Sequence, residues 1–317
     1  MSSALRLAPG LRLAHPVIVA AGGGGFGSEL LEAAGDEAPA MLVTRSVTLG
    51  PERGAAPPRM HGLPDGLLHG IGTPNPGLEA VLRRHGPRWS SFEVPVVVSI
   101  CGHDADGLAS MARILEMAPE VSGVELNLAC ADRPRGGRPI CLDLEAAEAA
   151  TVVVRAATDL PLLVKLSAIV PDLRPVARAV VAAGADAISV TASLPALDLD
   201  EARSGTALGA GSGWLSGPAV KHVGLRAVHE LARAVKVPLI GVGGVATLDD
   251  VLDYLAVGAS AVGLATAALA DPTLPGRLGG ALAAWCEQRA LQPAELVGRA
   301  IPRRPQRSRG RGAALRR

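Results

Sequence analysis

The chain has 317 residues and a mass of 32.1 kDa, and 49% of its residues are hydrophobic, 19% charged and 2% aromatic. This apolar content is enough for one large core, which excludes a disordered protein. The scarcity of aromatic rings argues against nucleic-acid binding by base stacking. The formal net charge of +1 gives the whole molecule no strong attraction to nucleic acid or to an anionic membrane.

Positive charge is concentrated at the C-terminus. Residues 303–317 contain seven Arg and no acidic residue, so residues 1–302 carry 24 basic and 30 acidic groups, a net charge of −6. We expect residues 1–302 to form a single domain and residues 303–317 to be a disordered, solvated tail. An arm that binds RNA or a partner is the alternative for this tail.

The cysteines and the apolar segments indicate neither a metal cluster nor a membrane span. Cys101, Cys130, Cys141 and Cys286 form no C-x-x-C pair, so we expect no iron–sulfur cluster, structural zinc or other metal site. The N-terminus is a poor signal peptide. The longest apolar stretch, residues 256–270, is too short to cross a bilayer. We therefore expect a cytoplasmic protein.

Short apolar runs alternate with helical patterns along the chain. The runs are nearly continuous, as in parallel strands that are covered on both faces. The predicted strands are Pro16–Ala20, Met41–Arg45, Pro95–Ile100, Gly123–Ala129, Pro161–Leu166, Ala187–Thr191, Pro238–Val242 and Ala261–Ala265. The clearest predicted helices are Ala105–Ala118, Leu144–Ala157, Leu173–Ala183, Lys221–Val235 and Thr247–Gly258, the last with Thr247 as its N-cap.

Eight strands with helical crossovers predict an α/β fold, a (β/α)8 TIM barrel. A doubly wound open sheet is the alternative, but its G-x-G-x-x-G fingerprint is not met. Residues 4–13 predict a hairpin around Pro9 and Gly10 that closes the bottom of the barrel. Two long loops, residues 46–76 and 193–220, follow strand ends at the C-terminal face, where barrels carry their active sites.

Glycine-rich turns follow the last two predicted strands, at residues 241–245 and 263–266. Glycines let backbone N–H groups approach an anion, and a following helix N-terminus adds favourable partial charge. In barrels these two loops are the usual phosphate site. The pattern favours a substrate phosphate or a phosphorylated cofactor such as FMN over simple tight turns.

Lys165 is the only lysine in the first 220 residues and lies at the end of the fifth predicted strand. A buried ammonium is costly unless it is paired. We interpret Lys165 as the partner of an anionic ligand, for example a reduced flavin. A structural ion pair and a Schiff-base nucleophile are the alternatives.

Cys130 follows the fourth predicted strand, close to Asn127 and to a loop that contains Arg133, Arg135 and Arg138. A cationic loop could lower the thiol pKa and close over a ligand, whereas an isolated cysteine is more often a buried apolar residue. We interpret Cys101 and Cys141 as structural. His69 lies in a loop at the active end, where it could contact a substrate or solvent.

Eight motifs in order resemble those of class 1 dihydroorotate dehydrogenases, nearer the type that works with an electron-transfer subunit. The resemblance covers about residues 5–296. The motifs are HPVIVAAG (15–22), TRSVTLGPERG (44–54), GIGTPNPG (70–77), ELNLAC (125–130), VKLS (164–167), LSGPAVK (215–221), IGVGGV (240–245) and GASAV (258–262).

The resemblance implies an FMN-containing barrel that oxidises a dihydropyrimidine. It implies that Cys130 is the catalytic base, which removes a proton while a hydride leaves for the flavin, and that Lys165 faces the flavin. The residues that it implies for the cofactor are Ala20, Ala21, Gly22, Arg45, Ser99, Asn127, Lys165, Thr191, Gly217, Gly243, Gly244, Ala265 and Thr266. Those implied for the substrate are Arg45, His69, Asn127, Asp132, Ala192 and Ser193.

The substrate side departs from the family pattern. The family lysine at the end of the second strand is Arg45, and three of the four asparagines that hold orotate are replaced by His69, Asp132 and Ala192. Each unsatisfied polar group of a buried substrate costs roughly 1–3 kcal/mol. The residues that match the family at the flavin are kept, whereas those that match it at the substrate are replaced. This difference indicates a paralogue with a changed substrate.

We therefore expect an FMN-dependent oxidoreductase that acts on dihydroorotate or on a related CH–CH substrate. A paralogue acting on a non-pyrimidine metabolite and a phosphate-binding lyase or isomerase that uses Lys165 are the alternatives, as is a flavin-binding protein whose catalytic pocket has decayed. The expected partners are a small-molecule substrate, an electron-transfer subunit and further copies of the chain.

Overall fold

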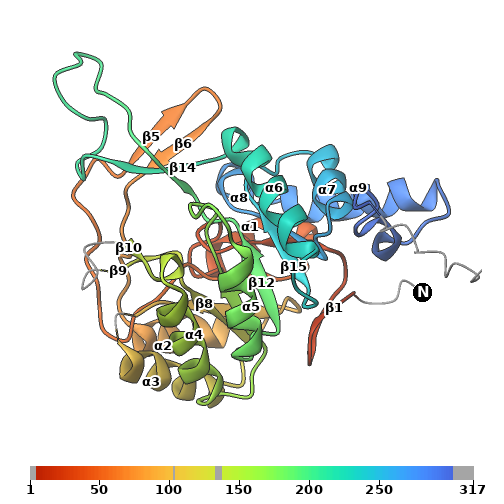
Figure 1. The fold of residues 1–317 in the computed structure, drawn as a ribbon, viewed down its shortest axis with the longest axis horizontal. Helices are drawn as coiled ribbons and strands as arrows, with labels where there is room; N and C mark the ends of the chain where they lie inside the picture. Colours follow the sequence, from red (N-terminus) through yellow and green to blue (C-terminus); the bar gives the residue numbers. More distant parts are fainter. Residues whose placement is uncertain (1–4, 103, 133–137, 303–317) are drawn as a thin grey trace, which may run out of the picture.

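The structure is a computed structural model, which describes residues 5–102, 104–132 and 138–302. Eight parallel strands form a closed barrel (Figure 1). In chain order they are β3 (Val17–Val19), β4 (Leu42–Val43), β7 (Val96–Ile100), β8 (Gly123–Asn127), β11 (Leu162–Lys165), β12 (Ala187–Val190), β15 (Leu239–Val242) and β16 (Ala261–Leu264). The last strand pairs with the first. The predicted (β/α)8 barrel is confirmed, and the arginine-rich tail lies outside the described residues.

Helices surround the barrel, as Figure 1 shows. Those of the described residues are α1 (Ser28–Ala34), α2 (Leu78–Trp89), α3 (Ala105–Glu116), α4 (Leu144–Arg155), α5 (Arg174–Ala182), α6 (Lys221–Ala232), α7 (Leu248–Ala256), α8 (Thr266–Ala270) and α9 (Leu274–Glu287). All five predicted helices are present. Helices α1, α2, α8 and α9 were not among those predicted; in α2, Gly86 and Pro87 interrupt the helical pattern. None of the described helices has the length and apolarity needed to span a bilayer.

Each barrel strand is buried on both faces. In β7, Val96 and Val98 pack outward into the core beneath the helices, whereas Val97 packs inward with Leu163 of β11. This two-sided burial explains why the strands read as continuous apolar runs. Fully burying a valine or leucine side chain contributes about 1.5–3 kcal/mol, so these two cores hold the barrel together.

A two-stranded hairpin closes the N-terminal end of the barrel, as predicted. Strands β1 (Leu5–Ala8) and β2 (Leu11–Leu13) are antiparallel, and Leu5 lies opposite Leu13. The buried side chains of Leu7 and Leu11 pack with inward residues at the starts of the barrel strands, among them Ile18. The barrel is therefore filled at this end and can hold a ligand only at the other.

The two long segments after β4 and β12 contain strands that the sequence analysis did not predict. These are β5 (Met60–Leu63), β6 (Gly66–His69), β13 (Leu194–Ala196) and β14 (Gly213–Ser216). They form one antiparallel sheet in the order β13-β14-β6-β5. Figure 1 shows β5, β6 and β14 projecting from the barrel. A further short pair, β9 (Ala131–Asp132) and β10 (Arg138–Pro139), lies after β8.

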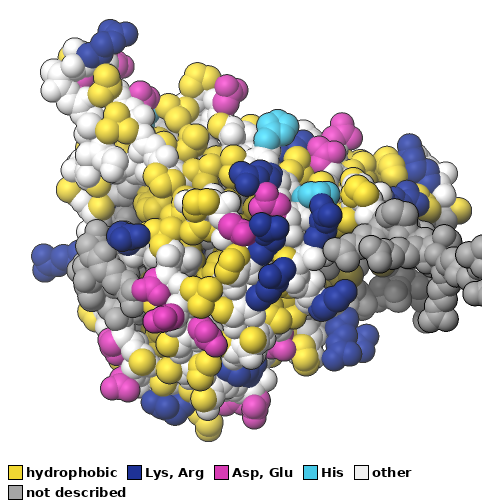
Figure 2. Space-filling view, in the orientation of Figure 1, with side chains coloured by type: hydrophobic (Ala, Val, Ile, Leu, Met, Phe, Trp, Pro, Cys, Tyr) yellow, Lys and Arg dark blue, Asp and Glu magenta, His cyan; other side chains and the backbone are white. Residues whose placement is uncertain are grey.

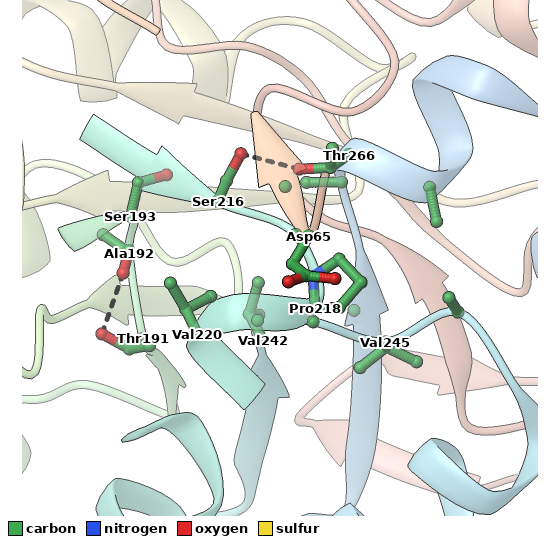
Figure 3. Close-up of a pocket in the computed structure, with 18 of the residues that line it drawn as sticks. Asp65, Thr191, Ala192, Ser193, Ser216, Pro218, Val220, Val242, Val245 and Thr266 are labelled. Atoms are coloured by element: carbon green, nitrogen blue, oxygen red, sulfur yellow. Dashed lines mark hydrogen bonds between the residues drawn. The ribbon is translucent and has the colours of Figure 1, made fainter. Parts of the chain in front are cut away.

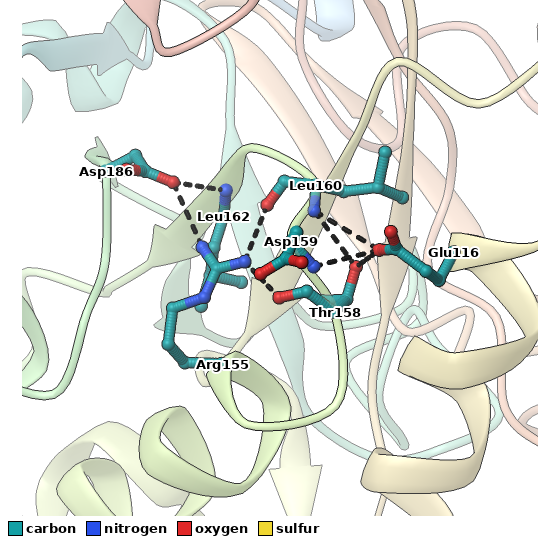
Figure 4. A network of polar contacts seen from close by, with 7 residues as sticks. All are labelled: Glu116, Arg155, Thr158, Asp159, Leu160, Leu162 and Asp186. Carbon is teal, nitrogen blue, oxygen red and sulfur yellow. Dashed lines mark hydrogen bonds and ion pairs between the residues drawn. The ribbon is translucent and has the colours of Figure 1, made fainter.

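A network of polar contacts fastens the chain where it enters β11 (Figure 4). Arg155 of α4 forms an ion pair with Asp186 at 3.2 Å and donates to the carbonyl oxygens of Thr158 and Leu160. The carboxylate of Glu116 accepts hydrogen bonds from the Thr158 hydroxyl and from the N–H of Asp159 and Leu160. The network orients the strand that carries Lys165 at its far end.

Candidate active site

A pocket of about 300 Å³ opens at the C-terminal end of the barrel (Figure 3). Lys165 of β11 and residues that follow β3, β12, β14, β15 and β16 line it, together with the β5–β6 turn. It brings together many of the residues expected to bind a cofactor or substrate: Ala21, Lys165, Thr191, Ala192, Ser193, Gly217, Gly243, Gly244, Ala265 and Thr266.

Lys165 is the last residue of β11 and faces this pocket. Its side chain is buried, with 6% of its surface exposed. Within the described part of the chain, it forms no ion pair with a carboxylate. A buried ammonium without a counter-ion costs several kcal/mol. The arrangement therefore suits an anionic ligand in the pocket.

The loop after β15 is shaped to approach a ligand closely. Gly243 and Gly244 have φ angles of 122° and 71°, which favour glycine. The Tyr254 hydroxyl donates to the carbonyl oxygen of Gly243 at 2.8 Å. A side chain on Gly244 would meet the backbone and Cβ of Lys221. Neither glycine donates its N–H to another described residue, so both amides remain available to an anion.

The helix that follows this loop does not contribute its N-terminus, contrary to our expectation. Thr247 caps α7 as predicted, but the Asp250 carboxylate accepts the N–H groups of Ala246 at 2.9 Å and Thr247 at 2.8 Å. The other oxygen of Asp250 pairs with Lys221 at 2.5 Å. This end of α7 is thus occupied by its own carboxylate, and a phosphate would depend on the loop amides.

The loop after β16 lies across the pocket from the residues after β14. The Thr266 hydroxyl donates to Ser216 Oγ at 2.8 Å, a contact drawn in Figure 3. The β5–β6 turn covers this part of the pocket with Asp65 and Gly66. A side chain on Gly66 would meet the Ser216 carbonyl, so glycine allows the turn to lie this close. The sequence analysis did not place the β5–β6 turn at the pocket, although Pro64-Asp65-Gly66 is a typical turn sequence.

Cys130 lies beside a second thiol that we had interpreted as structural. Its side chain interacts with the Cys101 thiol and the Ser46 hydroxyl. The pKa of Cys130 is lowered chiefly by the hydrogen bond from Cys101, and also by Ser46 and the Lys165 charge, while burial and Glu125 oppose the shift. The sequence could have indicated this proximity, because Cys101 and Cys130 follow two consecutive predicted strands that lie side by side in a parallel barrel.

A chain of hydrogen bonds runs beneath Cys130. Asn127 Nδ2 donates to Ser46 Oγ at 2.8 Å, the hydroxyls of Ser46 and Ser99 are 2.9 Å apart, and Ser99 donates to Glu125 Oε1 at 2.9 Å. Glu125 is fully buried inside the barrel. Ser99 and Asn127 were expected in the site, whereas Ser46 and Glu125 were not singled out.

His69 contacts Ser193, which lines the pocket. His69 Nε2 and Ser193 Oγ are 3.0 Å apart. Burial, reinforced by the charge of Lys165, lowers the pKa of His69, so the imidazole is neutral near neutral pH. Burial and the charge of Arg59 lower the pKa of Arg45 in the same way.

Several expected residues are not among those that line this pocket: Ala20, Gly22, Arg45, His69, Ser99, Asn127 and Cys130. Ala20 is buried and donates its N–H to the Leu264 carbonyl at 2.8 Å. Gly22 has a φ of 95° and faces open space. The side chain of Asp132 lies outside the part of the chain that the structure describes, as do Arg133 and Arg135. No cluster of metal-binding side chains is found in the described residues.

Comparison with known proteins identifies the family. A family model described as dihydroorotate dehydrogenase matches residues 6–283. The chain belongs to the dihydroorotate dehydrogenase family. The expected family membership is confirmed, and the chain is an oxidoreductase that acts on CH–CH groups in a generally flavin-dependent family.

Several similar relatives carry the name dihydroorotate dehydrogenase B (NAD(+)), catalytic subunit. The protein of Desulforudis audaxviator (strain MP104C) is 41% identical over 297 residues, which cover 92% of this chain and 95% of the relative. The protein of Trichlorobacter lovleyi is 36% identical over 281 residues, covering 89% and 92%. The protein of Geotalea uraniireducens is 34% identical over 293 residues, covering 92% and 96%.

Proposed function

We propose that the flavin of this protein is FMN and that it binds in the pocket described above. Among the residues that the structure describes, the ammonium of Lys165 has no carboxylate partner and the amides of Gly243 and Gly244 donate to no other group, and these observations support an anionic cofactor here. Lys165 would neutralise charge on the reduced ring, and the glycine amides together with Thr266 would hold the phosphate. Ala21, Thr191, Gly217 and Ala265 would complete the cofactor site, flanked by Ala20, Gly22, Arg45, Ser99 and Asn127.

The chemistry divides between the cofactor and the chain. The flavin, when bound, accepts a hydride from the substrate. Cys130 would accept the accompanying proton on its sulfur, so that the substrate loses two hydrogens and gains a C=C bond. A thiolate is the reactive form for this role, and the lowered pKa of Cys130 favours it. Asn127, Arg45 and Ser193 would orient the substrate beside Cys130.

The proposed substrate is a dihydropyrimidine, with oxidation of dihydroorotate to orotate as the reaction in pyrimidine biosynthesis. A second candidate is another cyclic CH–CH substrate. It is favoured because His69 and Ser193 bond each other at 3.0 Å and Ala192 offers no hydrogen-bonding side chain. A pyrimidine edge would have to compete with the His69–Ser193 contact or do without its partners.

We further propose that this chain works with an electron-transfer subunit and with further copies of itself. The relatives' printed names call them catalytic subunits. Met60, Leu197 and Leu199 are 51%, 57% and 48% exposed. His61 Nε2 lies 3.3 Å from Asp198 Oδ2, which joins the two segments that carry these apolar side chains at the projecting sheet. Such a surface suits a partner.

A single domain over residues 1–302 and a cytoplasmic location belong to the same proposal. All four cysteines are free thiols in the structure, and a thiolate base is best preserved in a reducing compartment. Figure 2 shows positive and negative side chains close together over much of one face. This mixture, with the net charge of +1, supports a small-molecule substrate over a nucleic acid or membrane.

The test is anaerobic bleaching of the flavin by a panel of dihydropyrimidines that includes dihydroorotate. Purified protein reconstituted with FMN should be yellow and should be bleached by at least one member. Cys130→Ser should keep the flavin but be reduced at least about a hundredfold more slowly, because serine is a poor base. Failure to bind FMN, or unchanged reduction of the variant, would contradict the proposal.

A further inference from the structure

Glu125 is a buried acidic side chain inside the barrel that the proposed reaction does not use. Only 1% of its surface is exposed. It lies on β8 between Ser99 of β7 and Leu163 of β11, which packs into the inward core. Among the described residues, no Lys or Arg forms an ion pair with Glu125. A buried carboxylate is costly unless it is hydrogen-bonded, so its partners matter.

Three hydrogen bonds lead from Glu125 to Asn127, and we call this series the Glu125–Asn127 network. Ser99 Oγ donates to Glu125 Oε1 at 2.9 Å, and the hydroxyl oxygens of Ser46 and Ser99 are 2.9 Å apart. Asn127 Nδ2 donates to Ser46 Oγ at 2.8 Å. The N–H of Val47, next to Ser46, donates to the Ser99 carbonyl at 2.9 Å. The backbone therefore holds the two serines side by side.

The hydrogen bonds of this network can run in only one direction. A hydroxyl has one proton, and the proton of Ser99 goes to Glu125, whose carboxylate only accepts. The proton between the two serines must therefore come from Ser46. With its own proton used, Ser46 can only accept from Asn127, and Nδ2 is the atom that lies there. Glu125 thus sets the sense of each bond as far as the Asn127 side chain.

The Asn127 carboxamide is held at both of its polar atoms. Its Oδ1 accepts the N–H of Ala129 at 3.0 Å. A flipped carboxamide would place its NH2 group against this N–H and its oxygen against Ser46, and both hydrogen bonds would be lost. The second N–H of Asn127 donates to none of the described residues. Asn127 is half-buried and in register with Lys165, which lines the pocket, so this N–H is available to a ligand beside Lys165.

We propose that Glu125 is a positioning residue, which acts through Ser99 and Ser46 to fix the Asn127 carboxamide with its second N–H toward the ligand. This inference rests on the proposed function, in which Asn127 orients the substrate. Glu125 touches no ligand and moves no proton, because its carboxylate only accepts a hydrogen bond. Without Glu125, the Ser99 hydroxyl could turn and donate to Ser46. Ser46 could then donate its own proton toward Asn127, and the carboxamide would lose its single orientation.

The sequence offers a direct way to observe this carboxamide. The chain contains only two asparagines, Asn75 and Asn127, so protein labelled with 15N in the asparagine side chains gives two NH2 pairs in a 1H–15N NMR spectrum. Asn75 Nδ2 donates to Thr48 Oγ1 and to the Thr73 carbonyl, both at 2.9 Å. These partners lie outside the Glu125–Asn127 network, so the Asn75 pair is an internal control.

The experiment compares Glu125→Met with wild type in the full-length protein without ligand. Methionine has a similar length and no strong acceptor. The Asn127 pair should shift, and its protons should exchange with solvent about tenfold faster, because a buried hydrogen bond is weakened. The Asn75 pair should stay unchanged in shift and in exchange rate. A general loosening of the fold would move both pairs, whereas the proposed role moves only one.

Three further variants define the cause. Ser99→Ala interrupts the network next to Glu125 and should reproduce the effect of Glu125→Met. Glu125→Gln keeps an acceptor oxygen for Ser99, so its exchange rate should lie closer to that of wild type. Thr151→Val is the matched control, because it removes a buried hydroxyl that donates to the Ala147 carbonyl at 2.7 Å on α4. It should leave the Asn127 pair unchanged.

An unchanged Asn127 pair in Glu125→Met would overturn the proposal, and so would equal acceleration of the Asn75 pair. Exchange in Glu125→Gln as fast as in Glu125→Met would also overturn it, because the accepted hydrogen bond would not be the cause. If Glu125→Met does not fold, Ser99→Ala is judged by the same criteria.

Ligand addition separates this inference from the proposed function. FMN followed by orotate, added to the wild-type protein, should shift the Asn127 pair and leave the Asn75 pair in place. If neither ligand moves the Asn127 pair while Glu125→Met does, the role of Asn127 in the proposed function is contradicted, whereas its orientation by Glu125 is supported.

Discussion

The hydroxyl of Tyr254 donates a hydrogen bond of 2.8 Å to the carbonyl oxygen of Gly243. This is the only tyrosine of the chain, and it is fully buried on α7. Burial, with the nearby charge of Asp250, raises the pKa of Tyr254, so the phenol keeps the proton that it donates. A helix of the outer layer thus sets the orientation of a peptide group in the pocket.

Replacing Tyr254 by Phe removes this contact and keeps the ring. The Gly243 carbonyl would lose its partner, so we expect the free energy of unfolding to fall by about 1–2 kcal/mol. We also expect weaker FMN binding, because the loop amides are no longer held toward the pocket. Fluorescence titration with FMN and chemical denaturation measure the two effects. Unchanged affinity in a destabilised variant would show that the loop keeps its shape without Tyr254.

Lys165 and Lys221 should respond in opposite ways to substitution by Met. Lys165 has no counter-ion among the described residues, so Lys165→Met should stabilise the flavin-free protein. Lys221 pairs with Asp250 at 2.5 Å and Asp253 at 2.8 Å, so Lys221→Met should destabilise it by about 1 kcal/mol. Thermal unfolding of the flavin-free proteins measures both. A Lys165→Met protein that unfolds earlier than wild type would mean that the ammonium has a stabilising partner.

Lys165→Met should also change the flavin itself. The ammonium would favour the anionic reduced form over the neutral oxidised form, so its loss should lower the reduction potential of bound FMN. Anaerobic redox titration measures this potential. The potential of Lys221→Met should match that of wild type, because its ammonium is held by Asp250 and Asp253 and Lys221 does not line the pocket. An unchanged potential in Lys165→Met would place the ammonium away from the ring.

His69 should make stability sensitive to acid. Burial and the charge of Lys165 hold its pKa below the usual value of 6.5 in the folded protein, so the unfolded chain binds the proton more readily. The contribution of the neutral imidazole is complete above the unfolded pKa and is lost as the pH falls through the folded one. Denaturation of His69→Gln across this range should give a shallower loss than wild type. Parallel curves would contradict the assignment, since His15 and His85 are present in both proteins.

Thr158 tests the network at the opposite end of the barrel. Its hydroxyl donates to Glu116, and this contact lowers the pKa of the carboxylate. Thr158→Val keeps the shape and removes the donor, so the free energy of unfolding should fall by about 1 kcal/mol. FMN affinity should stay at the wild-type value because the network lies at the other end of β11. Loss of flavin binding would show that the two ends of the strand are coupled.

The eight barrel strands were predicted from the sequence because each is buried on both faces. Runs such as Val96–Ile100 are then apolar at every position except Ser99, and the pattern is visible without knowing the neighbours. Strands β5 and β13 were missed for the opposite reason. Their residues alternate between half-buried and exposed positions. They belong to a sheet that is completed only when β6 pairs with β14, more than a hundred residues away.

Local sequence therefore determined the barrel, its N-terminal hairpin and the cap of α7. It also singled out Lys165, the only lysine in the first 220 residues. Only the tertiary structure decided that Cys101 meets Cys130, that Ser46 joins Asn127 to Ser99, and that Asp250 occupies the helix end beside the glycine loop. The reason is that periodicity records which face of an element is buried, whereas contacts between strand ends depend on how the closed barrel aligns them.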